Sequence, residues 1–174
     1  LEVLKFSAEL VKKESLNLEF GVYSGRSINF LSNEFKKVYG FDSFQGLPET
    51  WHTNIVKGAF ALKRIPNVNS NVDLIKGWFE DTLPNFKEFK KKDVFISFLH
   101  VDCDLYSSTK TIFKYCGDYL RPGSIIVFNE YFNYPGWEQG EFKAFKEYIQ
   151  EKSIKYEYIC YNINHEQVAV KLLK

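Results

Sequence analysis

The stretch LEFGVYSGRSI, residues 18–28, runs from an apolar segment through two glycines into a segment with helical spacing. Its apolar part predicts a strand at 16–20, and the apolar residues that follow predict a helix over roughly 25–37. A tight turn alone explains one glycine. Gly21 and Gly25 together, at the start of a helix, indicate that a ligand approaches the backbone closely there.

Strand-length apolar runs alternate with helical segments along the rest of the chain. Further strands are predicted at 38–42, 72–77, 93–102 and 124–130, and further helices at 83–89, 107–120 and 138–152. Residues 156–173 read as a terminal hairpin. This alternation predicts an α/β fold, a Rossmann-like open sheet that is mostly parallel, with a C-terminal antiparallel hairpin and helices on both faces. No repeat or Pro/Gly-rich linker divides the chain, so 1–174 is predicted to be a single domain.

Composition excludes several classes of function. Lys and Arg total 23 and Asp and Glu total 22, which gives a net charge of +1. The chain therefore lacks the excess of positive charge that is typical of proteins binding nucleic acid or an anionic membrane. The 3 cysteines are widely spaced and form neither a disulfide framework nor a zinc motif, which favours a reducing cytoplasm. No apolar run reaches the length of a membrane-spanning helix. We therefore expect a cytoplasmic protein with a small-molecule ligand.

Ligands of open parallel sheets bind at the carboxyl ends of the strands. Asp42 ends a predicted strand 21 residues after Gly21, where a carboxylate commonly accepts hydrogen bonds from ribose hydroxyls. It reads equally well as a loop-capping residue when taken alone. Trp78 follows Gly77 at another strand end and is either an adenine-packing or a core aromatic residue. Tyr23 stands where a dinucleotide fingerprint has its second glycine, so a diphosphate does not fit, and we predict an adenosine-containing ligand without one.

The segments LEFGVYSGRSI, GFDSFQGLPE, GWFEDTLP, HVDCDLYSST and RPGSIIVFNEY occur in the order seen in class I S-adenosylmethionine-dependent methyltransferases. Over roughly residues 15–150 the chain most closely resembles the macrocin O-methyltransferase family, which methylates sugar hydroxyls of natural products. The resemblance implies an enzyme that transfers a methyl group from S-adenosylmethionine to a hydroxyl oxygen of a small molecule, with a sugar as one candidate.

The same resemblance implies a role for each strand end. Glu19, Gly21 and Gly25 would line the methionine part of the cofactor, Asp42 would hold the ribose with Ser43 beside it, and Trp78 would lie by the adenine. The full set expected to bind the cofactor is Glu19, Gly21, Tyr23, Gly25, Asp42, Ser43, Gly77, Trp78 and Asp102.

Asp102 matches the family's first metal-binding acid and is the expected catalytic residue, either as general base or as a metal ligand. The family has two aspartates after its fifth strand, whereas this chain has Asn129 and Glu130. Asp102, Asn129 and Glu130 offer hard oxygen ligands, so we predict a Mg²⁺ site there, with a metal-independent base as the alternative. Asp104 is expected to cap the following helix, and His100 to be a satisfied core histidine.

Two aromatic segments are candidate walls of the site. The long segment 43–71 is a candidate lid, and 131–142, with Tyr131, Tyr134 and Trp137, is a candidate acceptor wall. About 15 residues precede the first strand, where the family carries extra helices, so the acceptor site is either open or completed by another subunit of a homo-oligomer. Two other functions stay open: a non-catalytic S-adenosylmethionine-binding domain and, disfavoured by the glycine spacing, a nicotinamide-dependent oxidoreductase.

Overall fold

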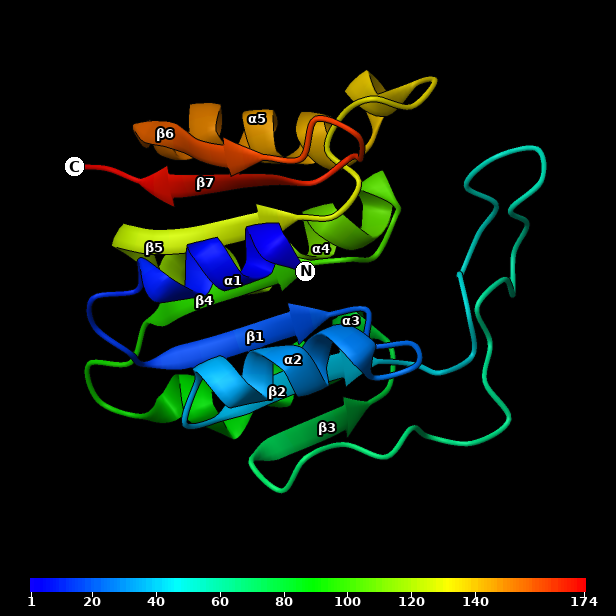
Figure 1. Ribbon diagram of the computed structural model, residues 1–174, viewed down its shortest axis with the longest axis horizontal. Coiled ribbons are helices and arrows are strands. Elements are labelled where there is room, and N and C mark those ends of the chain that lie inside the picture. Colours follow the sequence, from blue (N-terminus) through cyan, green and yellow to red (C-terminus); the bar gives the residue numbers. More distant parts are fainter.

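The computed structural model describes residues 1–174 and has a seven-stranded sheet at its centre, in the order β3-β2-β1-β4-β5-β7-β6 (Figure 1). The strands are β1 (Leu16–Phe20), β2 (Val38–Asp42), β3 (Val72–Lys76), β4 (Ile96–Val101), β5 (Leu120–Phe128), β6 (Tyr156–Tyr161) and β7 (Val168–Leu172). Strands β1 to β5 pair in parallel, whereas β7 is antiparallel to both β5 and β6. The predicted mostly parallel sheet with a C-terminal hairpin is confirmed.

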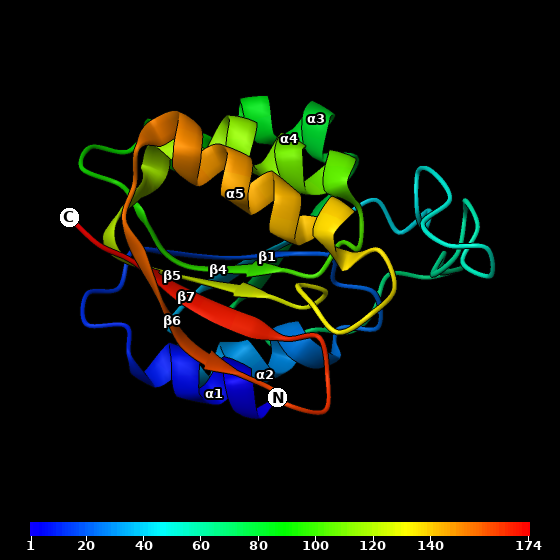
Figure 2. The same ribbon diagram turned by 90° about the horizontal axis from the view of Figure 1, so that it is seen from above.

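Helices cover both faces of the sheet, as predicted. In Figure 2, α1 (Glu2–Glu9) and α2 (Arg26–Glu34) lie on one side, and α3 (Phe79–Thr82), α4 (Tyr106–Cys116) and α5 (Glu141–Lys152) lie on the other. Because side chains alternate along a strand, each face has its own core. The larger core has 23 buried residues and the smaller, under α1 and α2, has 14. The central strands β1 and β4 are buried throughout, as expected for strands covered on both faces.

Several element boundaries differ from the predictions. Helix α1 was not predicted, although Val3, Leu4, Ser7 and Ala8 follow a helical spacing and are buried. The predicted helix over 83–89 is instead two short 3₁₀ helices, Leu83–Asn85 and Lys87–Lys90. The predicted helix over 107–120 gives way to a 3₁₀ turn after Cys116.

The sequence Arg121-Pro122-Gly123, between the predicted helix over 107–120 and the predicted strand over 124–130, lies inside β5. The strand accommodates it through an irregularity, since the register with β4 shifts between Ile96 and Phe98 and Gly123 has a φ of 95°. The Ser124 hydroxyl accepts the N–H of Arg121 at 3.0 Å and donates to the carbonyl of Ile96 at 2.5 Å. β5 therefore begins at Leu120, ahead of the predicted strand over 124–130, and bends at this irregularity.

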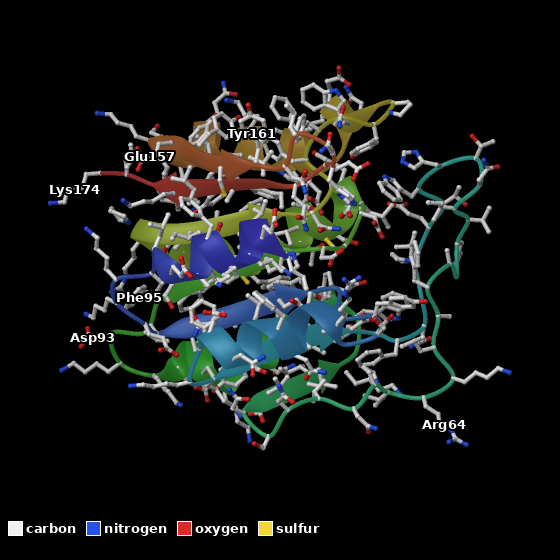
Figure 3. The ribbon with its side chains drawn as sticks, in the orientation of Figure 1. Arg64, Asp93, Phe95, Glu157, Tyr161 and Lys174 are labelled. Carbon is white, nitrogen blue, oxygen red and sulfur yellow. The ribbon has the colours of Figure 1, made fainter.

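Residues 43–71 form a long loop beyond the carboxyl ends of β1, β2 and β3, and contain no helix or strand (Figure 1). Two loop-closing backbone bonds join Leu47 to Ala59 and to Gly58, each at 2.9 Å. In Figure 3, Arg64 points away from the sheet at the outer side of this loop, whereas Asp93 and Lys174 lie at the opposite edge. The loop therefore stands beside the edge at which a parallel sheet binds ligands.

Candidate functional site

A cavity of 560 Å³ lies at the carboxyl ends of the parallel strands, within the size range of small-molecule sites. Eight of the residues predicted to form the site line it: Gly21, Tyr23, Asp42, Ser43, Trp78, Asp102, Asn129 and Glu130. Three others, Glu19, Gly25 and Gly77, do not line it. The structure thus brings most of the predicted residues to one cavity, from segments that are far apart in the sequence.

The two glycines of the turn after β1 are required by the backbone itself. Gly21 has a φ of 91°, and a Cβ placed on it would lie 1.7 Å from the carbonyl oxygen of Asp102. Gly25 has a φ of 82° at the N-terminus of α2. Gly21 therefore excludes any other residue even without a ligand, and Gly25 has a backbone conformation that favours glycine. The close approach at Gly21 also holds the end of β1 against the end of β4, beside the cavity.

Asp42 ties this turn to the end of β2. Its Oδ2 accepts the backbone N–H groups of Val22 at 2.8 Å and Tyr23 at 2.9 Å, and its Oδ1 accepts that of Phe44 at 2.7 Å. A carboxylate has about four acceptor sites, so a free lone pair remains for a ribose hydroxyl. Capping and ligand binding, which the sequence left as alternatives for Asp42, are therefore compatible.

Four acidic side chains gather beyond β4 and β5: Asp102, Asp104, Glu130 and Glu141. Burial raises the pKa of Asp102 to about 6, and burial together with the charge of Asp102 raises that of Asp104 to about 7. Burial and the neighbouring carboxylates also hold the pKa values of Glu130 and Glu141 well above their usual range. Asp104, Glu130 and Glu141 consequently tend to keep protons near neutral pH unless a cation compensates the charge of this acidic cluster.

Asp104 does not cap α4, so that prediction is wrong. The N-cap of α4 is Leu105, and no side-chain hydrogen bond caps this helix. Asp104 has a φ of 64°, while the N–H of Leu105 closes a tight turn on the carbonyl of Cys103 at 2.7 Å. This backbone geometry carries the Asp104 carboxylate into the cavity lining instead.

A chain of hydrogen bonds orients the side chains after β5. Gln167, in the β6–β7 connection, donates to Oδ1 of Asn129, and the Asn129 amide donates to Oε1 of Glu130. The backbone N–H of Glu130 donates to Oε2 of Glu141 at 3.1 Å, while Oε2 of Glu130 is buried without a partner. Gln167 and Glu141 were not predicted from the sequence, because their roles depend on contacts with residues that are distant along the chain.

His100 is buried but only half satisfied, which corrects the prediction of a satisfied core histidine. Its Nδ1 lies 2.9 Å from Oε2 of Glu19, and the other carboxylate oxygen of Glu19 accepts the Ser27 hydroxyl at 3.0 Å. Its Nε2 has no partner. Burial acts to lower the pKa of His100, but the hydrogen bond with Glu19 and the negative charges of Glu19 and Asp102 together outweigh it, so the net shift is upward. His100 and Ser27 line the cavity, with the buried Glu19 between them.

The loop 43–71 supplies one wall of the cavity through Leu47, Pro48, Trp51 and Phe60. The prediction that Tyr131, Tyr134 and Trp137 of the segment 131–142 form a wall of the site is wrong, because none of them lines the cavity. Tyr131 is 4% exposed in the larger core, and Trp137 packs against Phe142. Tyr134 instead contacts Trp51, with ring centroids 5.5 Å apart, and so joins the loop to the segment after β5.

Comparison with known proteins gives consistent results. A family model described as a methyltransferase domain matches residues 18–131. A tetracenomycin-related 4'-O-methyltransferase of Streptomyces olivaceus is 24% identical over 162 residues, which cover 75% of this chain and 59% of that protein. The chain thus spans less than two thirds of this relative.

Solved structures share the fold. The calicheamicin methyltransferase CalS11 superposes with a TM-score of 0.75 and 21% identity, over 97% of this chain and 77% of that one. An O-methyltransferase from Bacillus cereus in complex with S-adenosylhomocysteine (SAH) gives a TM-score of 0.64 and 16% identity, over 99% and 79%. None of the helices has the length and apolarity needed to cross a membrane.

Proposed function

Since the chain belongs to the methyltransferase-domain family, we propose that it transfers a methyl group from S-adenosylmethionine to a hydroxyl oxygen of a small molecule, with sugars as the first acceptors to test. The observation that carries this proposal is the position of Asp102. Asp102 lines the cavity beside the Gly21 turn and belongs to the acidic cluster. One end of the cavity is therefore suited to a nucleoside and the other to a proton-transfer reaction.

The cavity residues fit the cofactor. Trp78 offers an aromatic face after β3, Asp42 offers a free lone pair after β2, and the glycine turn lies after β1. When bound, S-adenosylmethionine supplies an activated methyl group that passes from its sulfur to the acceptor oxygen, leaving SAH. The protein then has two tasks, which are to align the acceptor within about 3–3.5 Å and to take its proton.

Asp102 is the side chain assigned to the proton. A carboxylate with a pKa of about 6 is largely ionised at neutral pH, yet is a stronger base than an ordinary aspartate. Asp102 is half-buried in the cavity wall, and its backbone carbonyl lies against Gly21. The hydroxyl proton moves to the Asp102 carboxylate as the new O–CH₃ bond forms, so charge does not accumulate on the acceptor oxygen.

The acidic cluster also fits a hard divalent cation in its donor chemistry. Asp102, Asn129 and Glu130 supply oxygens, and Oε2 of Glu130 is buried without a partner. These three residues would hold Mg²⁺, which would lower the pKa of a bound acceptor hydroxyl. No three His, Cys, Asp or Glu side chains are already arranged to hold an ion. The oxygen of Asn129 already accepts a hydrogen bond from Gln167, and its amide nitrogen donates to Glu130, so the Asn129 side chain would have to turn from these partners to offer its oxygen to the ion.

Turnover with a panel of hydroxylated acceptors, including free and nucleotide-linked sugars, tests the proposal. Methylation of an acceptor oxygen, detected by mass spectrometry and lost in Asp102→Asn, is the expected result. SAH binding without turnover on any sugar, phenol or alcohol acceptor would favour a non-catalytic cofactor-binding domain instead. Failure to bind SAH in calorimetry would contradict the proposal at its first step.

A further inference from the structure

His100 stands in the cavity wall with one ring nitrogen engaged and the other without a partner. Its side chain is 1% exposed, and Nδ1 pairs with Glu19 at 2.9 Å. Its Nε2 is buried and accepts or donates no hydrogen bond within the protein. A buried polar atom left without a hydrogen-bond partner destabilises the protein. Such an atom in a residue that lines a cavity indicates that a ligand supplies the missing bond.

The ring of His100 is held in place and cannot turn to find another partner. Glu19 is 0% exposed and lies directly opposite His100 in the pairing of β1 with β4. Its second carboxylate oxygen accepts the hydroxyl of Ser27, in the first turn of α2, at 3.0 Å. Since Glu19 is fixed from two sides, its bond to Nδ1 sets the orientation of the imidazole and the position of Nε2.

The strand order indicates which part of the cofactor reaches this position. Trp78 follows β3 and Asp42 ends β2, where the adenine and ribose are proposed to bind. Next in the sheet come β1 and β4, which carry Gly21 and His100, and the Glu130 side of the cavity lies beyond them after β5. A cofactor extended along this edge therefore brings its amino-acid end to the neighbourhood of His100.

We infer that Nε2 of His100 forms a hydrogen bond with the amino-acid end of S-adenosylmethionine, and that Glu19 and Ser27 position the imidazole for it. The inference rests on the proposed function, because it takes that cofactor as given. The amino-acid end carries a carboxylate and an ammonium group, and an imidazole nitrogen pairs with either. The adenosine end has its own partners two strands away.

Calorimetry with two ligands tests this assignment. SAH carries the amino-acid end, whereas 5'-methylthioadenosine has the same nucleoside and sulfur but lacks it. In His100→Asn, the short amide can keep the bond to Glu19 while the atom at the Nε2 position is removed. In His100→Gln, the longer amide reaches toward the Nε2 position instead. We expect His100→Asn to lose about tenfold in SAH affinity and nothing for methylthioadenosine, with His100→Gln losing less.

A measurement on the unmodified protein accompanies the variants in case these do not fold. With ¹⁵N-labelled histidine, the Nε2 resonance of His100 is expected to shift when SAH binds and to stay unchanged with methylthioadenosine. Equal losses of affinity for both ligands would overturn the proposed role of His100 but not the cofactor assignment. The same conclusion would follow if the protein binds SAH and the Nε2 resonance does not shift. A wild-type protein that binds neither ligand would overturn the cofactor assignment and this inference with it.

Discussion

The carboxylate of Asp42 and the backbone N–H of Val22 form a hydrogen bond of 2.8 Å, although 20 residues separate them in the sequence. The bond joins the end of β2 to the glycine turn after β1, and a second bond from Tyr23 to the same oxygen reinforces it. Asp42 thus shapes the turn beside the proposed ribose position. Its side chain has a structural task and a proposed binding task at once.

Asp42→Ala is accordingly expected to weaken SAH binding and to lower the free energy of unfolding. Hydrogen bonds to a charged group contribute about 1.5–3 kcal/mol each, and three backbone donors lose their acceptor. Calorimetry and urea denaturation measure the two effects. Asp42→Asn is the matched control, because it keeps one acceptor oxygen. A folded Asp42→Ala protein with unchanged SAH affinity would show that the ribose binds elsewhere.

Asp102→Asn is expected to lower turnover by at least about 10²-fold while SAH affinity changes little, because general-base catalysis contributes about 10²–10⁴-fold. In the unmodified protein, burial raises the pKa of Asp102 to about 6. Since the base must be ionised, kcat should fall as the pH drops below about 6 and level off above it. A rate that is independent of pH between 5 and 8, with chemistry shown to be rate-limiting, would exclude Asp102 as the base.

The acidic cluster should make the metal-free protein less stable as the pH rises. The pKa of Asp104 is about 7 in the folded state, against 3.8 for an ordinary aspartate, so the folded state binds more protons than the unfolded state between these values. Stability therefore decreases as the pH rises from about 4 to 7. Asp104→Asn should remove part of this slope and add about 1–3 kcal/mol at pH 8.

Denaturation of both proteins in the presence of a chelator, at pH 5 and pH 8, checks this expectation. Asp118→Asn is a suitable control, since Asp118 forms an exposed ion pair with Lys152 at 2.9 Å, away from the cluster. An Asp104→Asn protein that is less stable than wild type at pH 8 would contradict the electrostatic explanation. It would show instead that the Asp104 carboxylate makes a needed contact.

The loop 43–71 should become more ordered when ligand binds. Apart from one isolated bridge between His52 and Ile55, it has no regular structure, and Trp51 and Phe60 face the cavity. Hydrogen exchange should slow in this loop with SAH, and slow further with an acceptor present, because Trp51 and Phe60 would pack against the bound ligands. Identical exchange rates in the free protein, with SAH, and with SAH and acceptor would show that the loop does not respond to ligand.

The sequence was sufficient to predict the sheet and the edge at which ligands bind, because strand ends in a parallel sheet converge whatever the details of packing. It did not predict what individual side chains do there. Asp104 turns into the cavity because of a positive φ that local spacing does not show. The pairing of His100 with Glu19 depends on a strand register that joins residues 81 positions apart. Glu141 acquires its role only once α5 packs beside Glu130.

A magnesium site is the last expectation, and Asn129 provides the sharpest test. If Asp102, Asn129 and Glu130 hold Mg²⁺, a chelator should abolish turnover while SAH binding survives, because the ion serves the acceptor. Asn129→Asp would place a second carboxylate beside Glu130 and should then raise Mg²⁺ affinity in calorimetry. Glu130→Gln should lower it, and Asp118→Asn should leave it unchanged. Without a metal, Asn129→Asp adds one more uncompensated acid to the cluster and should only destabilise the protein at pH 8. Full turnover in chelator, together with loss of turnover in Asp102→Asn, would reject the ion and leave Asp102 as the base.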